Sequence, residues 1–508
     1  MRKRMKIKTL IWSIIVIILY LLSVIINAVT DWFNVRFGVS FEEILFTITS
    51  PLEGSDVSFL GEAIDFVMVE VWAVIPILLI GIVISVIVLM LLGYVCAKVR
   101  VIIYKWSIVI SFETIYKMGV LVMVLFLVIS SVDYGFTSLD LGTYISRRVQ
   151  KTTIYEDYYV NPKTAEISLI GEPKNIIYIY MESMETTYAS IEEGGSQEGV
   201  NYIPHLTQLA KDNVSFSDTE MLGGGYCTTG TGWTMGALFG TTTGVPFSFP
   251  VQGNSMQFFD SFAPGITSLG DVLEEYGYKQ IFLCGSDGVF AGRQAYFEQH
   301  GNYEVRDVFY ARRKGYIPED YWVWWGYEDA KLYEIAKKEI AEIAKSDIPF
   351  NYTMLTVDTH HVDGYICSNC QKNYNDQLGN VLQCADSQLH DFILWCQEQE
   401  FYEDTVIVIT GDHFRMDSSL VSDKVRRMYN CIINSNTPVE GTAKNRWFTT
   451  LDLFPTTLSA MGFEIEGDRL GLGTDLFSST PTLSEELGYD YFDAELGKYS
   501  DYYVNEFE

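Results

Sequence analysis

The chain is 508 residues long and has a formal net charge of −30 at neutral pH, yet its mean hydropathy is +0.12. This length predicts roughly two or three structural units rather than one ordinary domain. A pI near 4.5 excludes nucleic acid as the expected partner, because binding a phosphate backbone requires an excess of Lys and Arg. High hydropathy together with high charge indicates that apolar and acidic residues are segregated along the chain.

The N-terminal region is typical of a membrane anchor. Its long apolar runs without charge are residues 9–30, 71–97 and, shorter, 118–132. A run of about 20 apolar residues spans the hydrocarbon core of a bilayer, and the first run is longer than the apolar part of a signal peptide. Glu113 and Lys117, just before the third run, have the i,i+4 spacing of a helical ion pair. We expect about three transmembrane helices.

Charge asymmetry predicts the orientation of these helices. The first eight residues, MRKRMKIK, are strongly basic, and Lys98, Arg100 and Lys105 follow the second apolar run. The segment 31–65, between the first two runs, has seven acids and a single Arg. Because positive residues stay on the cytoplasmic side, three spans would place everything after about residue 133 outside the cytoplasm.

The rest of the chain predicts an α/β domain. Strands are expected at 175–180, 278–284, 350–357 and 405–410; helices are expected at 204–211, 231–240, 327–345, 379–400 and 449–462. This alternation predicts a mostly parallel sheet with helices on both faces. The expected divisions are 1–133 for the transmembrane region, 134–172 for a juxtamembrane connector, 173–480 for the large domain and 481–508 for an acidic, aromatic C-terminal tail. That tail fits either a small appended element or a flexible segment.

Three of the predicted strands end on residues that bind metals or phosphate. Glu182 follows NIIYIYM, His360 and His361 follow NYTMLTVDT with no gap, and Asp412 and His413 follow TVIVITG. Because the carboxyl ends of parallel strands lie along one edge of a sheet, these side chains are expected to converge there. Two carboxylates and an imidazole predict a divalent-metal site. Each residue alone also fits an ordinary role, such as a capping acid or a solvated histidine.

The segment 223–236, GGGYCTTGTGWTMG, is rich in glycine and threonine and leads into a predicted helix. A threonine at a helix N-terminus lies beside unpaired N–H groups, which form a natural cradle for phosphate or sulfate. A hydroxyl becomes a competent nucleophile when a metal lowers its pKa. An ordinary N-cap threonine is the alternative.

Three other features attract attention. Arg293, in FAGRQAYFEQHG, has a planar fork suited to a phosphate oxygen, although a surface salt bridge would also explain it. The aromatic stretch 321–325 fits core packing or the lining of a lipid or glycan groove. Cys367, Cys370 and Cys384 cluster in the sequence, and a loop disulfide is expected there rather than a metal if the domain faces an oxidising compartment.

Together these motifs resemble those of the sulfatase/alkaline-phosphatase superfamily and, more narrowly, of the membrane-anchored phosphoglycerol transferases, which include lipoteichoic acid synthases and the enzyme that decorates periplasmic glucans. The motifs are NIIYIYMES, TGTGWT, FAGRQAYFEQHG, VDTHHVDGY, TGDHF and FTTLDLFPTTLSAMGFEIEGDRLGLGTDLF, which span about 175–477 in the order of the family. The resemblance implies an alkaline-phosphatase-like fold for 173–480, which would be the catalytic domain. A sulfatase proper is disfavoured, because the residues after Cys227 lack the C-x-[PA]-x-R pattern.

The resemblance also implies roles for individual residues. The family's metal ligands fall on Glu182, Asp412 and His413, and its nucleophilic threonine, which also binds the metal, falls on Thr231, with Thr228 and Thr229 as alternatives. Its substrate-contacting residues fall on Arg293 and His360. His361 has no counterpart in the synthases and is expected to help bind substrate.

The expected function is metal-dependent transfer of a phosphoglycerol group from phosphatidylglycerol to a hydroxyl of a glycan or a glycerolphosphate polymer. A covalent phospho-threonine would be the intermediate, and His360 would protonate the leaving oxygen. One Mn²⁺ is expected, with Mg²⁺ or Zn²⁺ as alternatives, and the protein would be multi-pass in the cell membrane with its catalytic domain outside. Alternative functions are phosphoethanolamine transfer, hydrolysis of phosphodiesters or sulfates, and a non-enzymatic scaffold that binds headgroups.

Overall fold

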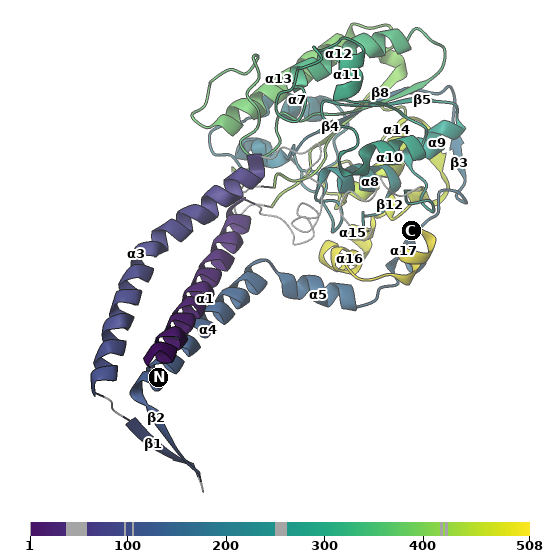
Figure 1. Ribbon diagram of the computed structural model, residues 1–508. Coiled ribbons are helices and arrows are strands. Elements are labelled where there is room, and N and C mark those ends of the chain that lie inside the picture. The colour runs from purple at the N-terminus through teal and green to yellow at the C-terminus, as the bar shows by residue number, and fades with distance from the viewer. Residues whose placement is uncertain are drawn as a thin grey trace. The chain divides into compact units, whose positions relative to one another are not determined.

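The computed structural model describes residues 2–36, 58–95, 98–103, 106–248, 262–416, 420–421 and 425–507. Most of the acidic segment between the first two apolar runs, and Lys105, lie outside these residues. The chain divides into two compact units (Figure 1). The first contains three long helices and ends at Thr143; the second runs from Tyr144 to the C-terminus.

The first unit consists of three long apolar helices and a hairpin. The helices are α1 (Arg2–Arg36), α3 (Ser58–Val95) and α4 (Phe112–Ser138), and the hairpin strands are β1 (Lys98–Ile103) and β2 (Trp106–Ser111). All three helices contain a segment long and apolar enough to cross a membrane. The third is longer than the apolar run predicts, because Ser111 caps its N-terminus and the Glu113 carboxylate pairs with Lys117 at 2.6 Å, as their spacing predicted.

Polar contacts between the helices establish their directions. The Lys117 ammonium donates to the Thr9 hydroxyl at 2.7 Å, and the Tyr134 hydroxyl donates to the Asp31 carboxylate at 2.6 Å. The first contact joins the beginning of α4 to the beginning of α1, and the second joins the later part of α4 to the later part of α1. The two helices therefore run in the same direction. The β1–β2 hairpin, which directly precedes α4, therefore lies at the same end of the bundle as the start of α1.

The second unit is built on a six-stranded sheet in the order β6-β5-β7-β4-β8-β9. The strands are β4 (Asn175–Met181), β5 (Lys279–Cys284), β6 (Glu304–Arg306), β7 (Phe350–Leu355), β8 (Thr405–Gly411) and β9 (Asn430–Ile433). All neighbours are parallel except β9, which is antiparallel to β8. The predicted α/β class is confirmed. Of the six strands of this sheet, the sequence analysis missed only the two edge strands, β6 and β9, which are too short for a clear pattern.

Helices cover both faces of this sheet (Figure 1). One face packs against α7 (Pro204–Asp212), α11 (Val308–Arg313), α12 (Asp329–Ile343) and α13 (Gln377–Gln397); the other packs against α8 (Thr234–Thr243), α9 (Leu269–Glu275), α10 (Arg293–Gln299) and α14 (Leu453–Ala460). Alternation along β4 separates the two cores, because Ile177 and Ile179 face the first set and Tyr178 and Tyr180 face the second. Helix α8 begins at Thr234, three residues after the predicted start.

Short elements complete the second unit. They are α5 (Leu141–Val149), whose first residues belong to the first unit, α6 (Ile154–Tyr158), β3 (Ile167–Leu169), β10 (Phe463–Ile465), β11 (Arg469–Leu470), β12 (Gly473–Thr474), α15 (Leu483–Leu487), α16 (Tyr489–Leu496) and α17 (Asp501–Glu506). The last three helices form the tail, where Phe492, Leu496 and Tyr503 are buried in the same core as α8. The Tyr489 hydroxyl donates to the carbonyl of Cys227 at 2.7 Å. The tail is therefore an ordered element beside the glycine-rich segment.

Candidate active site

The two central strands place Glu182 and Asp412 side by side. In the parallel register of β4 and β8, Met181 lies opposite Gly411, so the next residue of each strand leaves the sheet at the same level. The end of β8 packs closely against the segment after β4. This packing requires glycine at position 411, because a Cβ there would lie 2.0 Å from the Met184 carbonyl oxygen. Strand β7 ends on the other side of β4, where the Glu182 N–H donates to the Thr356 hydroxyl at 2.9 Å.

Three oxygen atoms lie around the imidazole nitrogen of His413 at this edge of the sheet. Nε2 of His413 lies 3.4 Å from Oε1 of Glu182, 3.4 Å from Oδ2 of Asp412 and 3.3 Å from the hydroxyl oxygen of Thr234. Donors at the corners of a tetrahedron are about 3.4 Å apart when the metal–ligand bonds are about 2.1 Å long. The spacing therefore fits a single four-coordinate divalent ion.

The hydrogen bonds around these side chains hold them in the form that binds a metal. Nδ1 of His413 lies 2.7 Å from the Phe414 carbonyl oxygen, so this nitrogen is the one that donates and Nε2 presents its lone pair to the carboxylates. Ser183 bridges both acids: its hydroxyl donates to Glu182 at 2.6 Å and its N–H donates to Asp412 at 2.8 Å. Ser183 has a φ of 51°, a strained conformation for a non-glycine residue.

The electrostatics of the group require a cation. Glu182, Asp412 and His413 are all at least 98% buried, and Oδ2 of Asp412 has no hydrogen-bond partner in the described part of the chain. Burial and the neighbouring Glu182 raise the pKa of Asp412 to about 7. Two buried carboxylates whose oxygens lie within 4.8 Å of one another repel, and a divalent ion would compensate their charge. The residues present therefore fit a metal.

Thr231, the threonine that the resemblance selected, does not join this group. Its hydroxyl is fully buried and is bonded within its own turn, where it donates to the Thr228 carbonyl at 2.9 Å and accepts from the Thr228 N–H at 2.8 Å. The helix starts later than predicted, so the first residue of α8 is Thr234. Its hydroxyl, which is partly exposed, lies beside His413. These contacts favour Thr234 over Thr231 as the threonine beside the candidate metal ligands.

The hydroxyls of the two alternative threonines make other contacts. The hydroxyl of Thr228 lies 3.4 Å from that of Thr231, and the hydroxyl and N–H of Thr229 both donate to Asp493 of α16. The preceding glycines allow this segment to pack tightly: a Cβ on Gly224 would lie 2.0 Å from the Met428 carbonyl oxygen. The glycine-rich segment is therefore a scaffold that positions the N-terminus of α8.

His360 lies next to the group and is neutral. Nδ1 of His360 lies 2.6 Å from the His361 carbonyl oxygen, and its ring stacks on that of His361 with 4.4 Å between centroids. Burial lowers the pKa of His360 to about 4, and the neighbouring His413 and Arg415 act in the same direction. At neutral pH the ring therefore accepts a proton more readily than it donates one, which disfavours His360 as a resting acid.

Arg293 is buried in its own loop. Its Nη2 donates to the Asp287 carbonyl at 2.7 Å and its Nε donates to the Phe290 carbonyl at 3.1 Å. Phe290 packs on Trp325, whose ring centroid lies 4.8 Å from that of His360. The arginine loop thus reaches His360 through two aromatic rings, and Trp325 of the aromatic stretch lines the site.

Sequence reasoning missed a buried ionic network behind the site. Arg415, which is fully buried, donates from Nη1 to the Thr359 carbonyl at 2.6 Å, and its N–H donates to Glu185 at 2.9 Å. Glu185 also accepts from Nε of Arg426 at 2.8 Å. The network ties the segment after His413 to the His360 loop. A charged residue two positions after a metal-binding pair was the only signal in the sequence.

Comparison with known proteins agrees with this geometry. The sulfatase family model matches residues 174–463. Phosphoglycerol transferase I of Xanthomonas campestris pv. campestris (strain B100) is 29% identical over 364 residues, which are 68% of this chain and 49% of that protein. Phosphoglycerol transferase I of Escherichia coli (strain SMS-3-5 / SECEC) is 29% identical over 334 residues, which are 63% of this chain and 41% of that protein. The chain thus spans about half the length, or less, of these curated relatives.

Solved structures share the fold. A protein of the alkaline phosphatase superfamily from Vibrio parahaemolyticus has a TM-score of 0.50 and 20% identity, covering 64% of this chain and 76% of that one. The integral membrane lipooligosaccharide phosphoethanolamine transferase A from Neisseria meningitidis has a TM-score of 0.50 and 13% identity, covering 87% and 83%. Because the family model covers more than half of the chain and the fold matches these structures, the chain belongs to the sulfatase family.

Proposed function

We propose that this protein transfers a phosphoglycerol group from phosphatidylglycerol to a hydroxyl of a glycan or of a glycerolphosphate polymer. One observation supports it above all: the Thr234 hydroxyl lies at the N-terminus of the buried helix α8, 3.3 Å from His413. The unpaired N–H groups and the dipole at this helix end favour a phosphate, so nucleophile and anion cradle coincide. The similarity to phosphoglycerol transferases supports the choice of group transferred.

Glu182, Thr234, Asp412 and His413 would hold one divalent metal ion. When bound, the ion lowers the pKa of a hydroxyl ligand and offsets negative charge on phosphate oxygens. One imidazole with oxygen ligands favours Mn²⁺ or Mg²⁺, whereas the donor spacing of 3.3–3.4 Å favours a tetrahedral ion such as Zn²⁺. Elemental analysis of the protein purified in detergent decides between them.

The proposed reaction consists of two successive displacements at phosphorus. In the first, the Thr234 oxygen attacks phosphorus, the bond to the diacylglycerol oxygen breaks, and that oxygen takes up a proton. In the second, an acceptor hydroxyl attacks the phosphoglyceryl-threonine and loses its proton, which restores Thr234. His360, neutral at rest, would take the proton of the Thr234 hydroxyl at Nε2 and deliver it to the leaving oxygen in the first displacement. In the second it would take the acceptor's proton and return it to the Thr234 oxygen, so that it is neutral again. Arg293 and His361 are proposed to position the donor headgroup.

The helical bundle supports a site outside the cytoplasm. The basic N-terminus and the basic β1–β2 hairpin lie at the same end of the bundle, and by the positive-inside rule this end is cytoplasmic. The chain leaves α4 at the opposite end, at Ser138. In this proposal residues 134–172 connect the membrane to the catalytic domain, 173–480, and the 481–508 helices support it.

The test is an assay of the full-length protein in detergent micelles with labelled phosphatidylglycerol or phosphatidylethanolamine. Release of diacylglycerol from phosphatidylglycerol, together with a phosphoglycerol adduct on the peptide that contains Thr234, is the expected result. Release from phosphatidylethanolamine alone would establish a phosphoethanolamine transferase. If neither lipid is cleaved by metal-loaded protein, the scaffold alternative replaces the enzyme.

A further inference from the structure

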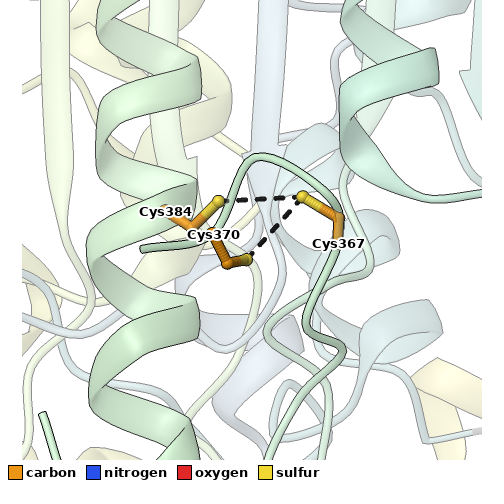
Figure 2. A group of neighbouring side chains, drawn as sticks. All are labelled: Cys367, Cys370 and Cys384. Carbon is orange, nitrogen blue, oxygen red and sulfur yellow. Dashed lines mark hydrogen bonds between the residues drawn. The ribbon is translucent and has the colours of Figure 1, made fainter. Parts of the chain in front are cut away.

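Three cysteines far from the catalytic threonine in sequence converge in the second unit (Figure 2). Cys367 and Cys370 lie in the loop after β7 that also contains His360, and Cys384 lies on α13. The sulfur of Cys367 is 3.7 Å from that of Cys370 and 3.8 Å from that of Cys384, and all three lie within 4.8 Å of one another. Apart from the catalytic group, this is the one metal-competent cluster among the described residues.

These distances do not fit the disulfide that the sequence led us to expect. A disulfide joins two sulfurs at about 2.05 Å, and it would draw one pair together and leave the third cysteine apart. Here Cys367 is almost equally distant from both partners. In a tetrahedral zinc–thiolate site with bonds of about 2.3 Å, neighbouring sulfurs are about 3.8 Å apart. The observed spacing is that of metal-bound thiolates.

The surroundings of the sulfurs are also those of a metal site. Gln388, one helical turn after Cys384, places its amide nitrogen 3.3 Å from the Cys384 sulfur and 3.9 Å from the Cys367 sulfur. The Gln388 side chain is about nine-tenths buried, and its carbonyl oxygen has no hydrogen-bond partner in the described part of the chain. Rotation of the amide by half a turn would direct this oxygen to the cluster as a fourth donor.

We infer that Cys367, Cys370 and Cys384 bind a second, structural metal ion of the zinc class, with the Gln388 carbonyl oxygen in the fourth position. Binding releases the three thiol protons to solvent. The ion fastens the His360 loop to α13, in addition to the 2.7 Å hydrogen bond from the Gln377 amide to the Gly364 carbonyl. The site is separate from the four catalytic donors and does not depend on the proposed transferase activity.

Metal content of the full-length protein in detergent tests the inference. Asp412→Asn removes a ligand of the catalytic group, so the metal that this variant retains reports the cysteine site alone. We expect about one ion per chain in Asp412→Asn and nearly none in the double variant with Cys384→Ser. The matched control is Asp412→Asn with Cys396→Ala, which removes another buried cysteine of α13 and should keep the ion.

A spectroscopic experiment tests the same metal site without substituting any cysteine. After chelation and loading of Asp412→Asn with Co²⁺, the intense thiolate-to-cobalt charge-transfer absorption is expected, because soft thiolates bind this ion. Absence of the band, or absence of metal in Asp412→Asn, would overturn the inference. A disulfide between two of the three cysteines, found by peptide mapping of the protein as purified, would overturn it too. Each of these results leaves the lipid-cleavage assay of the wild type unaffected.

Discussion

Two threonines three residues apart are predicted to respond in opposite ways to the same substitution. Valine has nearly the shape of threonine, so Thr234→Val and Thr231→Val each remove a hydroxyl and little else. The Thr234 hydroxyl lies 3.3 Å from His413, whereas the Thr231 hydroxyl is bonded to the backbone of Thr228. The first substitution therefore removes the proposed nucleophile, and the second removes a bond that supports the turn.

The magnitudes follow from these contacts. Removal of a nucleophile in a covalent mechanism lowers turnover by about 10⁴–10⁶-fold, which is about 5–8 kcal/mol in activation free energy. Thr234 is partly exposed, so the unfolding free energy should change by about 1 kcal/mol or less. Thr231→Val removes the hydroxyl that accepts from the Thr228 N–H in a buried turn, whereas the Thr228 carbonyl keeps its bond from the Thr231 N–H, so the cost is about 1–3 kcal/mol in unfolding free energy.

The assay measures diacylglycerol release from phosphatidylglycerol per folded molecule, with the folded fraction taken from thermal unfolding of the same sample. Thr234→Val should keep its Tm and lose turnover; Thr231→Val should lower the Tm and keep most of its turnover per folded molecule. Thr234→Ser, which restores a hydroxyl, should recover part of the rate. If Thr234→Val keeps turnover within tenfold of wild type while folded Thr231→Val loses it, the assignment of the nucleophile is wrong.

Three further predictions concern the metal and the core. Ser183→Ala removes the hydroxyl that donates to Glu182, and metal affinity measured by calorimetry should fall by about 10–100-fold; an unchanged affinity would contradict the supporting role of Ser183. The pKa of Asp412 is raised to about 7 in the metal-free protein, so a metal ion and a proton compete for this carboxylate below pH 7. The metal affinity should therefore fall by about tenfold for each unit by which the pH is lowered. A metal affinity that stays constant between pH 5.5 and 7 would show that Asp412 is not a ligand. Burial raises the pKa of Asp386 to about 7, although its carboxylate accepts hydrogen bonds from the first N–H groups of α7. Between about pH 4 and 7 the folded state therefore binds one proton more than the unfolded state. The free energy of unfolding consequently falls as the pH rises through this range. Asp386→Asn should flatten this part of the Tm profile relative to wild type, and parallel profiles would refute the account.

The sequence was most informative where local pattern and structure coincide. Continuous apolar runs identify the buried parallel strands β4, β7 and β8, because such strands are covered on both faces. The residues directly after two of these runs, Glu182, Asp412 and His413, therefore had to lie at one edge of the sheet. Their convergence is confirmed by the register of Met181 with Gly411.

The choice of threonine could not be made in the same way. Four threonines lie within seven residues, and the sequence does not say which of them begins the helix. That depends on the turn at Gly230, whose φ is 84°, and on the packing of the preceding glycines against Met428. Ser183 and Arg415 were missed for a related reason, because their roles depend on partners from other strands and loops.

The sequence by itself determined the sulfatase-like sheet, the apolar helices and three candidate metal ligands at the ends of β4 and β8. Only the tertiary structure decided that Thr234 lies beside His413, that burial lowers the pKa of His360 and that three cysteines meet at the spacing of metal-bound thiolates. The physical reason is the range of the interactions involved. Hydrophobic periodicity is encoded by neighbours in the chain, whereas donor spacing and burial are set by segments that meet only after folding.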